Sequence, residues 1–291
     1  MRKYLLTLLL AATAIHAQDA LELAAAPKPK KIEKVKPKKI FESLAEQATD
    51  FTAPLLQLQF QNWYNYTVWN SDSTSNTFVV RPVIPLNRTR SFPFQQLIRA
   101  TAKVVTTPKM PRHSTGLGDT QVFDLFLYEF PDWGRIGFGP MAILPSATNQ
   151  HKIGQGKWQL GPAFAAMLLK AHHWQFGILA QNPYGFLGNS GHKNVISLFL
   201  QPLITVHFPG NWYLISNAEM TFQWRPKQVE IPLNIGIGKV AKVKGQPINA
   251  FLQTEWVVYR KHAEFQPHFT IKAGFHFLFP DSPADLDRAG P

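Results

Sequence analysis

The stretch HFTIKAGFHFLF, residues 268–279, alternates in chemistry along its length. The odd-numbered positions are all apolar: Phe269, Ile271, Ala273, Phe275, Phe277 and Phe279. The even-numbered positions are polar or small, except at Leu278. Successive side chains of a strand point to opposite faces of a sheet, so this period of two predicts a β-strand with one apolar face. A half-buried strand of a soluble sheet would show the same pattern.

The end of this stretch carries a more specific signal. Lys272, Gly274, Phe277 and Phe279 resemble the polar-x-Gly-x-x-aromatic-x-aromatic motif by which the assembly machinery of bacterial outer membranes recognises its barrels. The resemblance implies the barrel assembly machinery as a partner, with outer-membrane lipid around the apolar face. Residues 280–291 follow the motif, and we expect them to be a short polar tail in the periplasm.

The composition favours a membrane β-barrel. The 291-residue chain has no cysteine, which excludes a disulfide scaffold and a thiolate metal site. Only 16% of its residues are charged and 13% are aromatic, unusual values for a soluble protein. No run of eighteen apolar residues follows the first twenty positions, which argues against transmembrane helices. These features predict a barrel, with a soluble all-β sandwich as the alternative.

The net charge of +12 does not indicate a nucleic-acid-binding protein, because half of it lies in one segment without aromatic residues. Seven lysines and Glu33 give residues 28–39 a net charge of +6. The lysines are Lys28, Lys30, Lys31, Lys34, Lys36, Lys38 and Lys39. We expect residues 18–40 to be a periplasmic linker rich in lysine and proline. It could contact anionic lipid or the cell wall, but a solvated spacer is the favoured interpretation.

Two further segments precede the barrel. Residues 1–17 combine a positive start, a short apolar run and a small residue, Ala17, as expected of a secretory signal peptide. Residues 41–53 predict a short amphipathic helix. That helix could plug the lumen or lie at the membrane surface, and the sequence leaves both open.

Residues 54–279 divide into about twelve alternating segments, and a strand needs about 9–11 residues to cross a bilayer. Connections of two kinds alternate along the chain. The short ones are residues 131–132, 170–173, 208–211 and 243–246, and the longer ones are residues 106–118, 145–156, 183–193 and 225–229. This alternation is typical of outer-membrane barrels, although residues 87–93 and 261–264 do not follow it. We therefore predict one antiparallel up-and-down transmembrane β-barrel with short periplasmic turns and both termini in the periplasm.

Tryptophans mark the expected strand ends. They form two groups, next to short turns or next to long loops: Trp133, Trp174 and Trp212 in the first, and Trp69, Trp158 and Trp224 in the second. Two such groups predict the aromatic girdles at the two membrane interfaces. Large residues at ordinary strand ends are the alternative.

If apolar residues face lipid, the charged and histidine side chains of the strands face the lumen. The residues assigned to the lumen in this way are Arg81, Arg99, Lys103, Asp124, Glu219, Glu255, His268, Lys272 and His276. A barrel of about twelve strands lies between the filled eight-stranded and the open sixteen-stranded type. These residues could form a selectivity ring or a salt-bridge network that holds the wall together, and neither is favoured. No metal site or cofactor is expected.

Several stretches resemble a bacterial family called "MetA-pathway of phenol degradation" proteins, sometimes labelled transporters or neuromedin U. The resemblance covers residues 42–279. The stretches are SLAEQATD, FVVRPVIPL, GLGDTQVFDLF with its Gly116-Leu117-Gly118-Asp119 element, GFGPMAILPSAT, GQGKWQLGPA and PLNIGIGKVAKVKGQPINAF. It implies an outer-membrane β-barrel that passes small molecules, hydrophobic or aromatic ones among them.

The leading functional prediction is a narrow passive channel for small-molecule solutes in the bacterial outer membrane. A structural or interaction barrel without a conducting lumen is one alternative. An outer-membrane lipid hydrolase is another, since Ser190 and His192 lie close together in an expected outer loop. Their spacing on a loop fixes no nucleophile–base geometry, so catalysis is not expected.

Overall fold

The computed structural model describes residues 43–280, except 90–92, 110–111, 131, 172, 189–190, 192–194, 226 and 263–265. The expected signal peptide and lysine-rich linker lie outside the described residues. So do residues 281–291 of the expected tail, and Ser190 and His192 of the hydrolase alternative.

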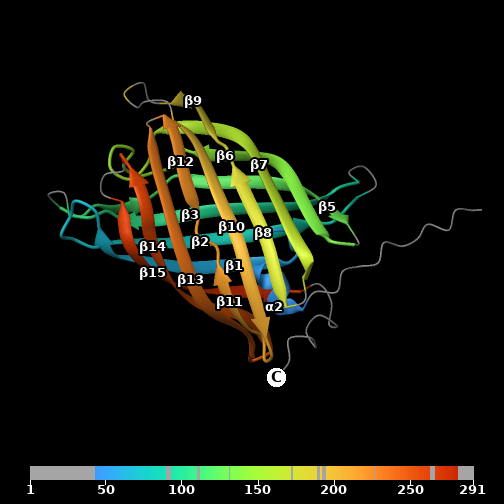
Figure 1. Cartoon of the computed structure of the whole chain (residues 1–291). Helices are drawn as coiled ribbons and strands as arrows, with labels where there is room; N and C mark the ends of the chain where they lie inside the picture. The colour runs from blue at the N-terminus through green and yellow to red at the C-terminus, as the bar shows by residue number, and fades with distance from the viewer. Residues whose placement is uncertain are drawn as a thin grey trace, which may run out of the picture. The chain divides into compact units, whose positions relative to one another are not determined.

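The described residues form one antiparallel sheet that closes on itself (Figure 1). Its fifteen strands are β1 (Leu56–Val68), β2 (Ser75–Leu86), β3 (Gln95–Thr106), β4 (Thr115–Leu117), β5 (Thr120–Phe130), β6 (Gly134–Leu144), β7 (Lys157–Ala171), β8 (Trp174–Gln181), β9 (Tyr184–Gly188), β10 (Ile196–Phe208), β11 (Trp212–Ser216), β12 (Met220–Arg225), β13 (Gln228–Val243), β14 (Gln246–Lys261) and β15 (Pro267–Phe279). Each strand pairs with its neighbours around the ring. The sheet closes where β15 pairs with β1, from Leu56 opposite Phe279 onward.

Three pairs of consecutive strands each occupy a single strand position in the barrel: β4 with β5, β8 with β9, and β11 with β12. The fifteen strands therefore form a closed barrel with twelve strand positions, and the predicted fold class is confirmed. Closure leaves no sheet edge unpaired, which is what a sheet needs if hydrocarbon surrounds it.

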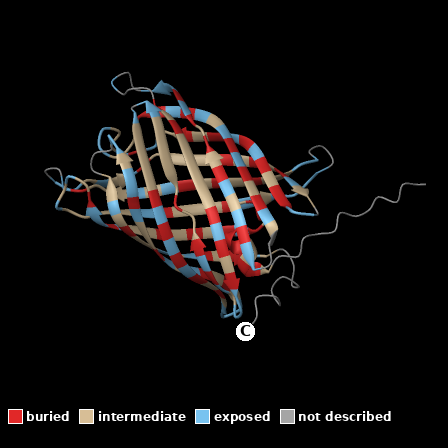
Figure 2. Ribbon diagram, in the orientation of Figure 1, coloured by how far each residue is buried: buried red, intermediate tan, exposed pale blue. Residues whose placement is uncertain are grey.

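The two faces of the wall differ as the sequence predicts for β15. Phe275 and Phe279 are 45% and 41% exposed on the outside, whereas His276 and Leu278 are buried inside. Figure 2 shows the same alternation of exposed and buried residues along other strands. A large apolar area on the outer surface is the reverse of what a soluble protein presents to water.

The connections agree only in part with the expected alternation. The shortest turn, Lys244–Gly245, has positive φ at both residues (50° and 84°), as a two-residue type I′ hairpin requires. The connection expected at residues 225–229 is shorter than predicted, because β12 ends at Arg225 and β13 begins at Gln228. Two of the longer loops expected from the sequence contain short strands, β4 and β9, which lengthen the sheet at those points.

The strand predicted near residues 212–224 is broken into β11 and β12. Residues 217–219 leave the ladder because Asn217 and Asn234 satisfy each other's polar groups. The backbone N–H of Asn217 donates to Asn234 Oδ1 at 2.7 Å, and Asn234 Nδ2 donates to Asn217 Oδ1 at 3.0 Å. The break gives Glu219 a place in an irregular segment next to the lumen.

The amphipathic helix predicted at residues 41–53 is present as α2 (Leu44–Thr49). Ser43 is its N-cap and forms a capping box with Glu46. Leu44, Ala45 and Ala48 pack against the inward-facing Val240 and Leu278, so the helix lies inside the barrel, at the end with the short turns. Of the two placements that the sequence left open, the structure therefore shows the plug. No helix in the described ranges has the length and apolar character to span a bilayer.

Candidate functional site

A cavity of about 430 Å³ lies within the barrel. Inward-facing side chains of β1, β2 and β3 line it on one side, and those of β12 to β15 line it on another. Residues 48–51, at the end of α2, line it as well. Seven of the nine residues predicted to face the lumen contribute to this cavity: Arg81, Arg99, Lys103, Glu219, Glu255, Lys272 and His276.

The basic side of the cavity consists of Arg81 on β2 with Arg99 and Lys103 on β3. Arg81 Nε donates to Thr101 Oγ1 at 3.1 Å. The Arg99 guanidinium lies 4.3 Å from the centre of the Phe123 ring, and its buried Nε has no hydrogen-bond partner. No carboxylate of the described residues lies within 4 Å of these three cations.

The acidic side consists of Glu219, Glu230 and Glu255. Lys272 Nζ is 2.6 Å from Glu255 Oε2, so this carboxylate is neutralised by a partner on the next strand. Glu219 and Glu230 form no hydrogen bond or ion pair within the described part of the chain. Glu230 was not among the predicted lumen residues, although it alternates with the apolar Ile231 and Leu233.

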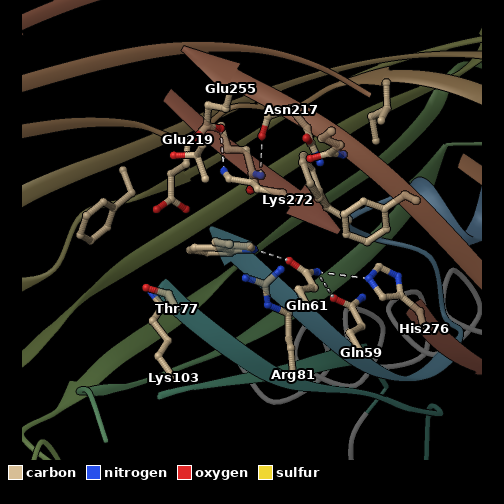
Figure 3. Close-up of a pocket in the computed structure, with 18 of the residues that line it drawn as sticks. Gln59, Gln61, Thr77, Arg81, Lys103, Asn217, Glu219, Glu255, Lys272 and His276 are labelled. Atoms are coloured by element: carbon tan, nitrogen blue, oxygen red, sulfur yellow. Dashed lines mark hydrogen bonds and ion pairs between the residues drawn. The ribbon is translucent and has the colours of Figure 1, made fainter. Parts of the chain in front are cut away.

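The two sides face each other across the cavity. Figure 3 shows Glu219 and Glu255 on one side and Arg81 and Lys103 on the other. The carboxylate of Glu219 is within electrostatic range of Arg81, Arg99 and Lys103, although it pairs with none of them. Opposite charges held apart in this way create an electric field across the lumen.

A polar ladder runs along the inner face of β1. Gln59 Nε2 donates to Gln57 Oε1 at 2.9 Å, and Gln61 continues the row. Gln61 Oε1 accepts from Trp63 Nε1 at 3.1 Å, and its Nε2 lies 3.2 Å from His276 Nε2 (Figure 3). Trp63 also lies beneath the ammonium groups of Lys103 and Lys272, 5.6 and 4.8 Å from the ring centre. These hydrogen bonds order the polar inner face of β1, a strand that contains no charged residue.

The opposite wall of the lumen is apolar, and here the sequence prediction was wrong. Phe123, Leu125 and Leu127 of β5 are buried in a cluster with inward-facing residues of β2, β3, β6, β7 and β8. Asp124 is therefore on the outer face, where Gln96 Nε2 donates to its Oδ2 at 2.8 Å. The assumption that apolar residues face lipid fails on β5, because Phe51 of the plug and Phe199 pack against this wall and make it a protein core.

The segment after α2 is fixed to the wall by polar contacts. Arg135 Nη1 on β6 donates to Asp50 Oδ2 at 2.7 Å, and Asp50 Oδ1 accepts from the N–H and hydroxyl of Thr52. Two strands further around the wall, on β8, Gln175 Oε1 accepts from Thr49 Oγ1 at 2.8 Å. The apolar contacts of α2 with Val240 on β13 and Leu278 on β15 lie across the lumen from these polar ones. We call residues 43–55 the plug. Its contacts span the lumen at the end with the short turns.

His268 lies outside the cavity, although it shares a face of β15 with Lys272. The centre of its ring lies 4.3 Å from that of Trp69, with the two planes tilted by 52°, close to the loop that joins β1 and β2. Trp69 also lies beneath the guanidinium of Arg260, at 4.1 Å, so it packs against protein at the loop end.

The remaining tryptophans predicted as girdles are exposed on the outer surface, with exposed fractions from 38% to 55%: Trp133, Trp158, Trp174, Trp212 and Trp224. Trp256, which the sequence did not single out, is 42% exposed. The described residues contain no group of three His, Asp or Glu side chains placed to hold a metal ion.

No protein-family model matches the chain, and no curated protein matches it. Among solved structures it is similar to the COG4313 outer membrane channel from Pseudomonas putida F1, with a TM-score of 0.58 and 10% identity over 86% of this chain and 100% of that one. It is also similar to the KdgM porin, alone and in complex with disordered oligogalacturonate, each with a TM-score of 0.46 and 9% identity over 77% of this chain and 99% of the other. At this identity, the likeness to the channel shows the barrel fold.

Proposed function

We propose that this chain is a narrow outer-membrane channel through which small polar solutes diffuse passively. The observation that supports this function most directly is the presence of Arg99, Glu219 and Glu230 in the lumen without ion-pair partners among the described residues. A buried charge without partners costs several kcal/mol unless water solvates it. The cavity is therefore expected to hold water, and water inside a sealed barrel provides a path through a membrane.

The lining also bears on which solutes pass. The family resemblance suggested small hydrophobic or aromatic molecules, and Trp63 and Phe251 do line the cavity. Charged and amide side chains provide most of its other contacts, however, and an apolar solute would have to displace water from them without replacing its hydrogen bonds. The lining thus favours small polar solutes.

The outer surface supports a location in the outer membrane. It presents apolar side chains all along β15, and five of the predicted girdle tryptophans are exposed on it. Leu56 and Phe279 both lie at the end with the short turns, which in outer-membrane barrels faces the periplasm. Lys272, Gly274, Phe277 and Phe279 would then be the signal for the barrel assembly machinery.

A structural barrel without conduction is the second candidate, and the plug is the observation that favours it. The plug contacts Arg135 on β6 and, across the lumen, Val240 on β13 and Leu278 on β15, so the wild-type pore is expected to be closed for part of the time. The unpaired lumen charges argue against this candidate, because a wall built only for stability would pair them.

The test is conductance of the purified full-length barrel in planar bilayers, together with swelling of liposomes in solutions of small sugars and amino acids. Discrete current steps and solute-dependent swelling are expected. Absence of both, for the wild type and for an Asp50→Asn variant with a weakened plug, would leave the structural candidate. Heat-modifiable gel mobility is the control for a folded barrel.

A further inference from the structure

We propose that the lumen cavity binds zwitterionic solutes, with a carboxylate held by Arg81 and Arg99 and an ammonium group held by Glu219 and Glu230. This inference rests on the proposed channel function and names the class of solute that the channel prefers. It follows from which charged groups of the cavity already have partners.

The carboxylate end is the better defined. Arg99 is 8% exposed and lines the cavity, and it makes no hydrogen bond within the described part of the chain. Phe123 supports one face of its guanidinium at 4.3 Å, which fixes the plane of the fork. Arg81, anchored through its Nε to Thr101, leaves its terminal nitrogens available. Two adjacent guanidiniums with open donors match the bidentate geometry of a carboxylate.

The ammonium end lies on the opposite wall. Glu255 is already neutralised by Lys272, at 2.6 Å, whereas Glu219 and Glu230 keep all their acceptor oxygens free of protein donors. The break in the ladder after Ser216 brings Glu219 to the edge of the lumen, and the Asn217–Asn234 contacts hold that break in place. An ammonium group, with three donors, satisfies free carboxylates of this kind.

The two ends together favour a zwitterion over an ion of one sign. An anion at Arg99 would be repelled by Glu219, which is within electrostatic range of the same arginine. A cation at Glu219 would likewise be repelled by Arg81 and Lys103. A solute with both groups can place its carboxylate at the arginines and its ammonium group at the glutamates, so that both interactions are attractive. A cavity of about 430 Å³ accommodates such a small molecule, since ligand pockets start at roughly 300 Å³.

Binding is tested by isothermal titration calorimetry on the full-length barrel in detergent, with three probes of equal chain length. The probes are 6-aminohexanoate, hexanoate and hexylammonium. We expect 6-aminohexanoate to bind at least tenfold more tightly than either singly charged probe. Equal or tighter binding of hexanoate would overturn the proposal in favour of a simple anion site, and equal or tighter binding of hexylammonium would overturn it in favour of a cation site.

Matched variants separate the two ends. Glu219→Gln should lower the affinity for 6-aminohexanoate at least fivefold and raise the affinity for hexanoate, whereas Arg99→Gln should lower the affinity for both carboxylates. Lys242→Gln, on the exposed end of β13, is the control and should change neither. Unchanged affinity for 6-aminohexanoate in a folded Glu219→Gln barrel would contradict the proposal. If Glu219→Gln fails to fold, Glu230→Gln provides the same comparison.

Conductance in planar bilayers distinguishes this proposal from the channel function itself. A barrel that conducts ions but binds 6-aminohexanoate no better than hexanoate keeps its channel function and loses the zwitterion site. A barrel that binds 6-aminohexanoate but never conducts, even as the Asp50→Asn variant, keeps the site and loses the channel function. Partial block of the current by 6-aminohexanoate alone would support both.

Discussion

Arg135 Nη1 lies 2.7 Å from Asp50 Oδ2, with side chains that are only 4% and 0% exposed, and this ion pair joins the plug to β6. It is the shortest polar contact between the plug and the wall among those described, and it lies where water is excluded. Loss of this ion pair should therefore change the fraction of time for which the lumen is open.

Asp50→Asn should make openings more frequent. Removing one partner of a buried ion pair destabilises the contact by roughly 3–5 kcal/mol, because the other charge stays buried. We expect a higher open fraction in planar-bilayer recordings, with the conductance of each open step unchanged. Asp72→Asn, in the exposed loop after β1, is the matched control. The same open fraction in Asp50→Asn and the wild type would mean that the plug does not gate the lumen.

Charge substitutions in the cavity should shift ion selectivity in opposite directions. A unit charge at roughly 10 Å in water contributes about 0.4 kcal/mol, a factor of about two in permeability. Glu219→Gln should raise the anion-to-cation permeability ratio by at least this factor, and Arg99→Gln should lower it. Reversal potentials under a salt gradient measure both, and the shifts should shrink in 1 M salt. Shifts of the same sign would contradict the opposed arrangement of the two sides.

Asp124→Leu tests the outward placement of a residue that the sequence assigned to the lumen. A carboxylate on the lipid face is unfavourable, so the variant should be stabilised by roughly 1–3 kcal/mol against urea in liposomes. Its ion selectivity should equal that of the wild type. A change of selectivity comparable to that of Arg99→Gln would instead indicate that Asp124 faces the lumen.

Gly238→Ala should destabilise the barrel. A Cβ atom at Gly238 would meet the Tyr213 ring at 2.2 Å, and Tyr213 is almost fully buried. Displacing the ring also breaks the hydrogen bond of its hydroxyl to Asn249 Oδ1, at 2.7 Å. We expect a loss of about 1–3 kcal/mol in urea unfolding. Tyr213→Phe, which removes only the hydroxyl, should lose about 1 kcal/mol, and an equal loss in both variants would argue against the steric account.

Phe279→Ala should lower the yield of assembled barrel in cells while leaving refolding of the purified chain unchanged. Phe279 is 41% exposed, so little packing is lost, but it is the last aromatic residue of the predicted assembly signal. Phe275→Ala, on the same face of β15 and 45% exposed, changes an unspecified x position of the motif and serves as the control. Equal yields of the two variants in outer-membrane fractions would contradict the role of Phe279 in an assembly signal.

The sequence predicted the barrel well because a period of two is a property of each strand on its own. Phe275 and His276 are assigned to opposite faces without any knowledge of their neighbours. The alternation alone does not determine which of the two sets of residues faces inward, however. Phe123 and Asp124 alternate as regularly as Phe275 and His276, and only the tertiary packing of Phe51 and Phe199 decides that Phe123 faces inward.

Seven of the nine residues predicted to face the lumen line the cavity, but the organisation of the cavity was not predicted. The nine expected lumen residues included both signs of charge, and the sequence could not separate a paired network from opposed groups. That distinction depends on which cation pairs with which carboxylate: Lys272 pairs with Glu255, and no cation of the described residues pairs with Glu219. The break in the wall at Glu219 depends likewise on Asn234, which lies on another strand.

The cavity has three unlike walls: guanidinium groups on one, carboxylates on another, and the apolar side chains of Phe51, Val83 and Phe199 on the third. Three different contacts around one point define a handed environment. A chiral zwitterion long enough to place its ammonium and carboxylate groups on the first two walls can turn a branch at its stereocentre toward the third in only one enantiomer. The pore should therefore transport the two mirror-image forms at unequal rates.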